Sequence, residues 1–160
     1  MPNSSNRAAA AHAASREVSD GTLRSFAGYS MKRAFNVIQA DLAETLAPFG
    51  LRMMSFTALI LVVDNPGLRQ TQLADALAME RSNLVTIVDQ LEERGWIARK
   101  PVPSDRRSHA LQATAEGVAV CRKAVAAAKA HEARLLAGLD AAETEKLKAA
   151  LMTVEKGKSA

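Results

Sequence analysis

The chain has 160 residues, of which 48% are hydrophobic, 24% charged and 4% aromatic, and its formal net charge is +4. That length favours one globular domain over two, and the mild basic excess permits a polyanionic partner without requiring one. No apolar run approaches the roughly 20 residues that cross a bilayer, no secretory signal opens the chain, and the single Cys121 excludes an intrachain disulfide. We therefore expect a cytoplasmic protein. Because aromatic residues are few, Leu, Ala, Val and Ile must build the core, which favours a mainly α fold.

The N-terminal part is expected to form a tail followed by one long helix. Residues 1–20 are rich in Ser, Asn and Ala and offer little to bury, so they are interpreted as a disordered tail. Over residues 22–46 apolar side chains recur at spacings of three, four and five, which predicts a helix about 37 Å long. Pro48 and Gly50 end this helix.

Three shorter helices and a ribbon are expected next. The helices span residues 52–63, 71–78 and 81–94. Residues 96–98 and 108–112 are interpreted as two strands without neighbours, joined by a basic, proline-containing turn.

Two helices complete the chain. Thr114 can cap the first, over residues 115–136. Asp140 and Glu143 have the spacing of a capping box, which begins the last helix. That helix carries apolar residues at helical spacing, namely Leu147, Leu151 and Val154.

The helix over residues 81–94 has the composition of a DNA-recognition helix. Ser82, Asn83, Thr86 and Gln90 share one face, and small polar side chains can enter a major groove about 12 Å wide and bind base edges. The same pattern occurs in a helical hairpin whose polar face is solvated. The C-terminal half carries Asp89, Glu92 and Glu93, which would repel phosphates, so the N-terminal half is expected to enter the groove. 

The ribbon that follows carries the local positive charge. Between Arg99 and Arg107 there are four basic residues and one acid, and arginine at a ribbon tip can reach a narrow minor groove. Our hypothesis is that Asp105 orients Arg107 at the tip. The predicted DNA-binding residues are Arg81, Ser82, Asn83, Thr86, Gln90, Lys100, Asp105, Arg106 and Arg107.

At these motifs the chain resembles the MarR-type regulators. The resemblance rests on Leu73-Ala74, on residues 81–85 and 91–97, on the wing signature over 105–107 and on Thr114-Ala115-Glu116-Gly117. It implies a winged helix-turn-helix over residues 50–117, flanked by long dimerisation helices over 21–47 and 118–157, within a single domain over 21–160. It also implies a homodimer on an inverted-repeat operator.

The resemblance further implies roles for individual residues. Base reading maps onto Ser82, Asn83 and Thr86, and phosphate and minor-groove contacts map onto Arg106 and Arg107. The family often has Arg where Thr86 stands, which leaves the base preference open. 

Family members commonly bind small aromatic or acidic effectors between the dimer helices and the DNA-binding lobes. The candidate ligand-binding residues here are Phe26, Tyr29, Lys32, Arg33, Met53 and Phe56. Tyr29 and Arg33 lie four apart and can offer a hydroxyl and a cation, whereas Met53 and Phe56 are equally typical of core. Resemblance to the subgroup that controls degradation of aromatic acids implies an aromatic acyl-CoA effector, with Lys32 and Arg33 near its phosphates. The expected function is a repressor released by such a ligand.

Three alternatives remain open. A redox-responsive regulator of the same fold would use a cysteine, but Cys121 has the helical spacing with Val118 and Val125 that is typical of core. A non-DNA-binding dimeric scaffold would not need the arginine-rich ribbon. An enzyme would need a motif such as a nucleophile elbow or a phosphate-binding glycine loop, which the sequence lacks, and no cofactor or metal is expected.

Overall fold

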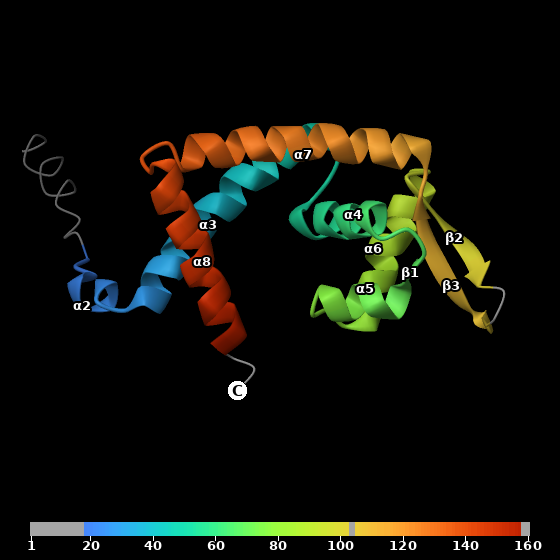
Figure 1. Ribbon diagram of the computed structural model, residues 1–160, viewed down its shortest axis with the longest axis horizontal. Helices are drawn as coiled ribbons and strands as arrows, with labels where there is room; N and C mark the ends of the chain where they lie inside the picture. Colours follow the sequence, from blue (N-terminus) through green and yellow to red (C-terminus); the bar gives the residue numbers. More distant parts are fainter. Residues whose placement is uncertain (1–17, 103–104, 158–160) are drawn as a thin grey trace, which may run out of the picture. The chain divides into compact units, whose positions relative to one another are not determined.

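A computed structural model describes residues 18–102 and 105–157, except for the side chains of residues 102–108. It contains helices joined to one small antiparallel sheet, as expected (Figure 1). The chain divides into two compact units, one ending at Asn36 and one beginning at Val37. Most of the predicted tail, residues 1–17, lies outside the described residues.

The first helical region differs from the prediction, because two helices replace one. The short α2 (Gly21–Arg24) is separated from α3 (Ala27–Leu46) by a turn at Ser25 and Phe26. The Ser25 hydroxyl donates to the carbonyl oxygen of Thr22 at 2.7 Å, and the amides of Ser25 and Phe26 donate three residues back rather than four. This side-chain competition for a helical carbonyl tightens the chain and interrupts the helix. 

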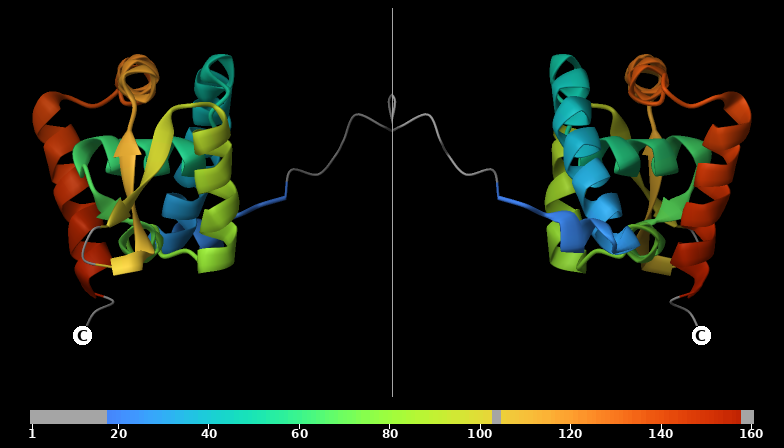
Figure 2. Two further views of the ribbon diagram at one scale, coloured as in Figure 1. Left: turned by 90° about the vertical axis from the view of Figure 1, so that its right-hand side faces the viewer. Right: turned by 90° about the vertical axis from the view of Figure 1, so that its left-hand side faces the viewer.

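The end of α3 is formed as predicted. A 3-10 turn, η1 (Ala47–Phe49), contains Pro48, and Gly50 then adopts the left-handed conformation with φ 65°. The following α4 (Met53–Asp64) buries Phe56, Ala58, Leu59 and Val62. It packs against both α6 (Arg81–Glu93) and α7 (Ala115–Leu135) (Figures 1 and 2).

The helix-turn-helix consists of α5 (Gln70–Ala76) and α6 (Arg81–Glu93). The turn between them places Ala78 at φ 47°, in the left-handed region that reverses the chain. Leu73, Leu84 and Leu91 are each no more than 1% exposed. Their burial fixes α6 so that its opposite face is left to solvent.

The sheet differs from the prediction in two respects. The strands β2 (Ile97–Val102) and β3 (Asp105–Ala113) extend through most of the residues that were expected to form a turn. A third strand, β1 (Leu68–Arg69), pairs with β3, so the order is β1-β3-β2 and the ribbon does have a neighbour. A two-residue strand carries no alternation of apolar and polar residues, so periodicity could not predict it. Pro101 lies on β2, an edge strand, where its missing amide is tolerated.

The two C-terminal helices begin at the predicted caps. The Thr114 hydroxyl accepts from the amide of Gly117 at 3.0 Å and opens α7 (Ala115–Leu135). Asp140 and Glu143 form a reciprocal capping box that opens α8 (Ala141–Lys156). Gly117 packs against the backbone of Trp96, where a Cβ atom would overlap the Trp96 carbonyl oxygen. This contact seats α7 on the root of the wing, which β2 and β3 form.

Among the described residues, no single helix is both long and apolar enough to cross a membrane. The bent pair Ala27–Phe49 and Met53–Asp64 meets the length and composition criteria only jointly, as a buried core helix in a soluble protein also can.

Candidate nucleic-acid interface

The N-terminal half of α6 presents a polar face to solvent. Leu84 and Val88 point into the core with 0% exposure, whereas Ser82, Asn83 and Thr86 are exposed. Arg81 at the first position of the helix is exposed as well. Small hydrogen-bonding side chains therefore project together from a helix whose other side is fixed by packing.

Two further α6 side chains refine that face. Val85, 42% exposed, lies beside the predicted residues and was missed by sequence reasoning, although an exposed methyl group can contact thymine. Gln90 is exposed two turns further on and borders a separate recess with Arg52, Arg94 and Trp96. The structure thus places Gln90 and Arg81 beside different recesses.

Ion pairs and a hydrogen bond join the C-terminal half of α6 to the wing. The Arg99 guanidinium on β2 bonds to Asp89 Oδ1 at 2.5 Å through Nη2 and to Glu92 Oε2 through Nη1. The other Glu92 carboxylate oxygen accepts the backbone amide of Arg99 at 3.0 Å. Burial lowers the pKa of Arg99, but its bonds to Asp89 and Glu92 outweigh that effect, so the pKa stays raised. Arg99, counted as wing charge from the sequence, is therefore engaged within the protein.

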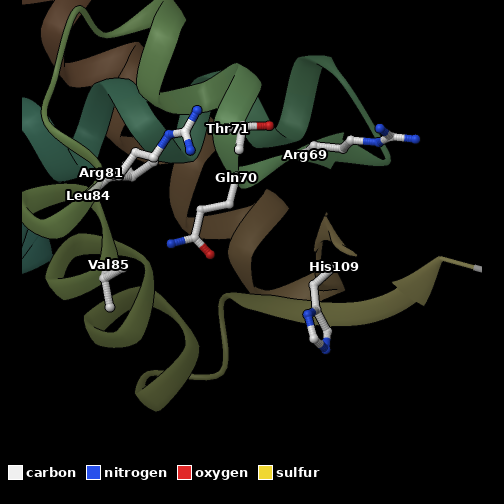
Figure 3. A pocket seen from close by; sticks show the side chains of 7 residues that line it. All are labelled: Arg69, Gln70, Thr71, Arg81, Leu84, Val85 and His109. Atoms are coloured by element: carbon white, nitrogen blue, oxygen red, sulfur yellow. The ribbon is translucent and has the colours of Figure 1, made fainter. Parts of the chain in front are cut away.

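A recess of about 350 Å³ with both polar and apolar lining residues opens beside the recognition helix (Figure 3). Its lining comes from the start of α5, from α6 and from β3: Arg69, Gln70, Thr71, Arg81, Leu84, Val85 and His109. The Arg69 side chain extends away from Arg81 (Figure 3). Sequence reasoning found Arg81 but missed Arg69, Gln70 and His109. His109 could not be found in this way because strand pairing, and not sequence proximity, brings it near the helices.

The predicted wing residues are placed in part. Lys100 is exposed on β2, and Asp105, Arg106 and Arg107 begin β3. The side chains of these three β3 residues lie outside the described residues, so the Asp105–Arg107 contact stays a prediction.

Comparison with known proteins identifies the fold. The family model described as MarR family matches residues 51–109. Over 121 residues the chain is 32% identical to the HTH-type transcriptional repressor Rv2887 of Mycobacterium tuberculosis (strain ATCC 25618 / H37Rv), covering 76% of this chain and 87% of that protein. The chain belongs to the MarR family. MarR-family proteins are DNA-binding transcriptional regulators and not enzymes.

Solved MarR-family structures share this architecture. The transcriptional repressor CouR bound to a 23-mer DNA duplex matches with a TM-score of 0.83 at 36% identity, covering 87% of this chain and 99% of that one. CouR from Rhodococcus jostii RHA1 bound to p-coumaroyl-CoA matches with a TM-score of 0.72 at 30% identity, covering 79% of this chain and 90% of that one. Rv2887 in complex with salicylic acid matches with a TM-score of 0.66 at 30% identity, covering 81% of this chain and 96% of that one. The winged-helix class predicted from the sequence is thereby confirmed.

Four of the candidate effector-binding residues of this MarR-family chain belong to the unit that ends at Asn36. There the Tyr29 hydroxyl donates to Asp20 Oδ2 at 2.9 Å, and Arg24 Nε donates to Asp20 Oδ1 at 2.8 Å. Hydrogen bonds from Arg24 and then Tyr29 lower the pKa of Asp20, and the bond to Asp20 raises the pKa of Tyr29. Of the remaining three, Phe26 and Arg33 are exposed, and Lys32 Nζ lies 5.6 Å from the Phe35 ring centroid.

The other two candidates belong to the unit that begins at Val37. Phe56 is 8% exposed and belongs to the hydrophobic core, whereas Met53 is half-buried. Phe56 also borders an apolar recess of about 330 Å³ formed by α3, α4, α7 and α8. His131 lines this recess at 5% exposure, and its Nε2 has no hydrogen-bond partner among the described residues, lying 3.9 Å from Asp41 Oδ2. 

Cys121 is a core residue, as its spacing predicted. It is 4% exposed, and burial, followed by the negative charge of Asp64, raises the pKa of its thiol. A raised pKa disfavours the reactive thiolate, so this environment is unlike that of a redox-sensing cysteine.

Proposed function

We propose that the chain is a transcriptional repressor that binds an inverted-repeat operator as a homodimer and is released by a small aromatic acid or its CoA thioester. The observation that carries the DNA-binding part is the exposed polar N-terminal half of α6, held by Leu84 and Val88 in a helix-turn-helix. The DNA complex of CouR, with which the chain shares 36% identity, supports the same conclusion.

Each part of the interface has a proposed contact. Ser82, Asn83 and Thr86 read base edges in the major groove, joined by Arg81 and flanked by Gln90. The recess beside Arg81 holds a backbone phosphate through Gln70 and His109, since phosphate contacts fix the register of the duplex. The wing enters the minor groove through Lys100, Arg106 and Arg107, with Asp105 orienting Arg107.

Residues 21–160 act as one domain in this proposal. The winged helix-turn-helix over 50–117 reads DNA, and the helices over 21–47 and 118–157 form the dimer in the cytoplasm. Exposed apolar side chains on α3 and α8, such as Phe35 and Leu151 at 44% and 45%, support the dimer because a second copy would bury them. Two recognition helices then meet half-sites about one DNA turn apart.

The proposed effector is an aromatic acid or aromatic acyl-CoA bound near Phe26, Tyr29, Lys32, Arg33, Met53 and Phe56. Support comes from Rv2887 in complex with salicylic acid and CouR bound to p-coumaroyl-CoA. To change operator occupancy from 99:1 to 1:99, the effector must prefer the released state by about 5.5 kcal/mol. The redox alternative receives no support from the buried Cys121.

The test of DNA binding starts from duplexes selected out of a random pool and measures affinity at increasing salt. We expect an inverted repeat and an affinity that falls steeply with salt, because phosphate binding releases counterions. Asn83→Ala should reduce affinity for the selected site about tenfold and relax base preference at one position. Gln112→Ala, an exposed amide on β3, is the matched control and should bind as the unchanged protein does. Salt-independent affinity would refute the proposal.

The effector is tested separately by titrating phenolic acids and their CoA thioesters into the protein–operator complex. Release by one compound class and not by free CoA is expected. Failure of every compound would remove the aromatic effector and leave the DNA-binding proposal standing.

A further inference from the structure

Arg99 joins two elements that must both approach DNA. It lies on β2, and both of its acidic partners lie on α6, ten and seven residues earlier. The side chains of Arg99, Asp89 and Glu92 are 23%, 45% and 36% exposed. The two carboxylates are thus open to solvent, while the cation is held mostly between them and the wing.

The position of Asp89 makes its charge consequential. Asp89 follows Thr86 by three residues and Ser82 by seven, so it lies along the same side of α6 as these two exposed side chains. Its Cα atom is only about 4.5 Å further along the helix axis than that of Thr86. This is well within the Debye length of about 8 Å at physiological salt, so an unpaired carboxylate there would act on any phosphate near the reading face.

We propose that Arg99 is a charge-masking residue that makes α6 acceptable to DNA. It offsets one of the two negative charges of Asp89 and Glu92 and bonds to both carboxylates, so that the recognition helix enters a groove lined by phosphates with one net negative charge in this cluster instead of two. Arg99 touches neither base nor phosphate in this role; it acts through the two acids. The inference rests on the proposed DNA binding.

The bonding pattern supports masking. Both Glu92 oxygens are occupied, one by the Arg99 guanidinium and the other by the Arg99 backbone amide. Asp89 receives the second arm of the same guanidinium. A fork of this kind is available to arginine and not to lysine, whose single ammonium cannot span two carboxylates with the same geometry. 

The experiment compares Arg99→Gln in two backgrounds, the natural chain and Asp89→Asn/Glu92→Gln. In the natural background Arg99→Gln should weaken operator binding about tenfold at low salt, and the loss should shrink at high salt. In the acid-free background the same substitution should cost no more than about twofold. Asp89→Asn/Glu92→Gln alone should bind at least as tightly as the unchanged chain.

A matched control removes a neighbouring charge that masks nothing. Lys100→Gln takes one cation from the exposed face of the wing. Its loss of affinity should be the same in both backgrounds, whereas the loss from Arg99→Gln should depend on the acids.

An Arg99→Gln loss that persists in the acid-free background would overturn the proposal, because it would make Arg99 a direct DNA contact. Weaker binding by Asp89→Asn/Glu92→Gln than by the unchanged chain would overturn it as well, because it would make the Arg99 ion pairs a structural strut. Circular dichroism shows whether Arg99→Gln folds. If it does not fold, the operator affinity of Asp89→Asn/Glu92→Gln tests the proposal instead. Weaker binding than that of the unchanged chain overturns masking, and equal or tighter binding supports it. Absence of DNA binding by the unchanged chain would instead refute the proposed function itself.

Discussion

The winged helix-turn-helix buries almost all of its large apolar side chains, whereas the segments that flank it leave many of theirs exposed. Leu59, Leu73, Leu84 and Leu111 are 0% exposed. Among the described residues, Val85 is the one large apolar side chain of the winged helix-turn-helix that stays exposed. The flanking segments leave many such side chains open: Val18, Leu23, Phe26, Met31, Phe35, Val37, Leu139, Leu147, Leu151, Met152 and Val154. 

This difference supports the proposed dimer, in which a second copy would cover the exposed apolar side chains of the flanking helices. Exposed apolar surface of this extent is typical of an interface rather than of a free monomer surface. Val85 is the informative exception, since it lies on the face proposed to meet DNA. Predictions that distinguish the two parts follow, from the largest expected effect to the smallest.

Leu84→Ala and Leu151→Ala remove the same side chain from the two parts. Leu84 is 0% exposed, so its truncation should lower the free energy of unfolding by about 3 to 4 kcal/mol through lost burial and a cavity. Leu151 is 45% exposed, so its truncation should weaken dimerisation and leave the fold of the protomer intact. Chemical denaturation and sedimentation over a range of protein concentrations measure the two effects. Similar unfolding losses with unchanged dimerisation would erase the distinction.

Gly117→Ala tests the contact that seats α7 on the wing root. The added Cβ would overlap the Trp96 carbonyl oxygen, and a backbone atom cannot move aside as a side chain can. We expect a loss of about 3 kcal/mol in the free energy of unfolding, measured by urea denaturation. Gly138→Ala, where a Cβ would meet open space, is the control and should change stability little. Tolerance of Gly117→Ala would show that this junction is looser than the structure has it.

The N-caps of α7 and α8 should contribute differently to the free energy of unfolding, because one lies at the wing root and the other at an exposed helix end. Thr114 accepts from Gly117 and also donates to the Gly95 carbonyl at 2.7 Å, whereas the Asp140 side chain caps an exposed helix end. Thr114→Ala should cost about 2 kcal/mol and Asp140→Ala about 1 kcal/mol in the free energy of unfolding. Calorimetric melting of both variants checks the order, and the reverse order would contradict the account.

Tyr29 offers the smallest and most local test, because it is the chain's one tyrosine and its ultraviolet titration is unambiguous. The hydrogen bond to Asp20 raises the pKa of Tyr29 above its ordinary value of 10.0. The stabilisation from this bond is therefore complete below pH 10.0 and is lost as the pH rises through the raised pKa. Asp20→Asn should move the midpoint of the titration back towards 10.0, and an unchanged midpoint would mean that the bond is absent in solution.

Local chemistry explains which elements the sequence predicts well. The end of α3 follows from Pro48 and Gly50, the end of α6 from Gly95, and the starts of α7 and α8 from the caps at Thr114 and Asp140. Each of these residues acts within a few positions of the chain. The exposed face of α6 follows from helical periodicity. Both depend on neighbours in the chain, which a sequence displays directly.

The features that the sequence did not reveal depend on distant or competing contacts. The break at Ser25 arises because its hydroxyl competes for a helical carbonyl, which periodicity ignores. Strand β1 exists only through its pairing with β3. Arg99 looked like one more wing charge until strand β2 brought it against Asp89 and Glu92. His109 likewise joins Arg69 and Arg81 through folding alone.

The most direct test of the central claim is the mass of the complex formed with a selected operator, measured by sedimentation on a duplex with both half-sites and on one with a single half-site. Two chains on the complete inverted repeat are predicted, with affinity for the single half-site lower by at least a hundredfold, because both recognition helices must bind together. One chain per duplex, with equal affinity for both duplexes, would contradict the division into a DNA-reading part and a dimerising part.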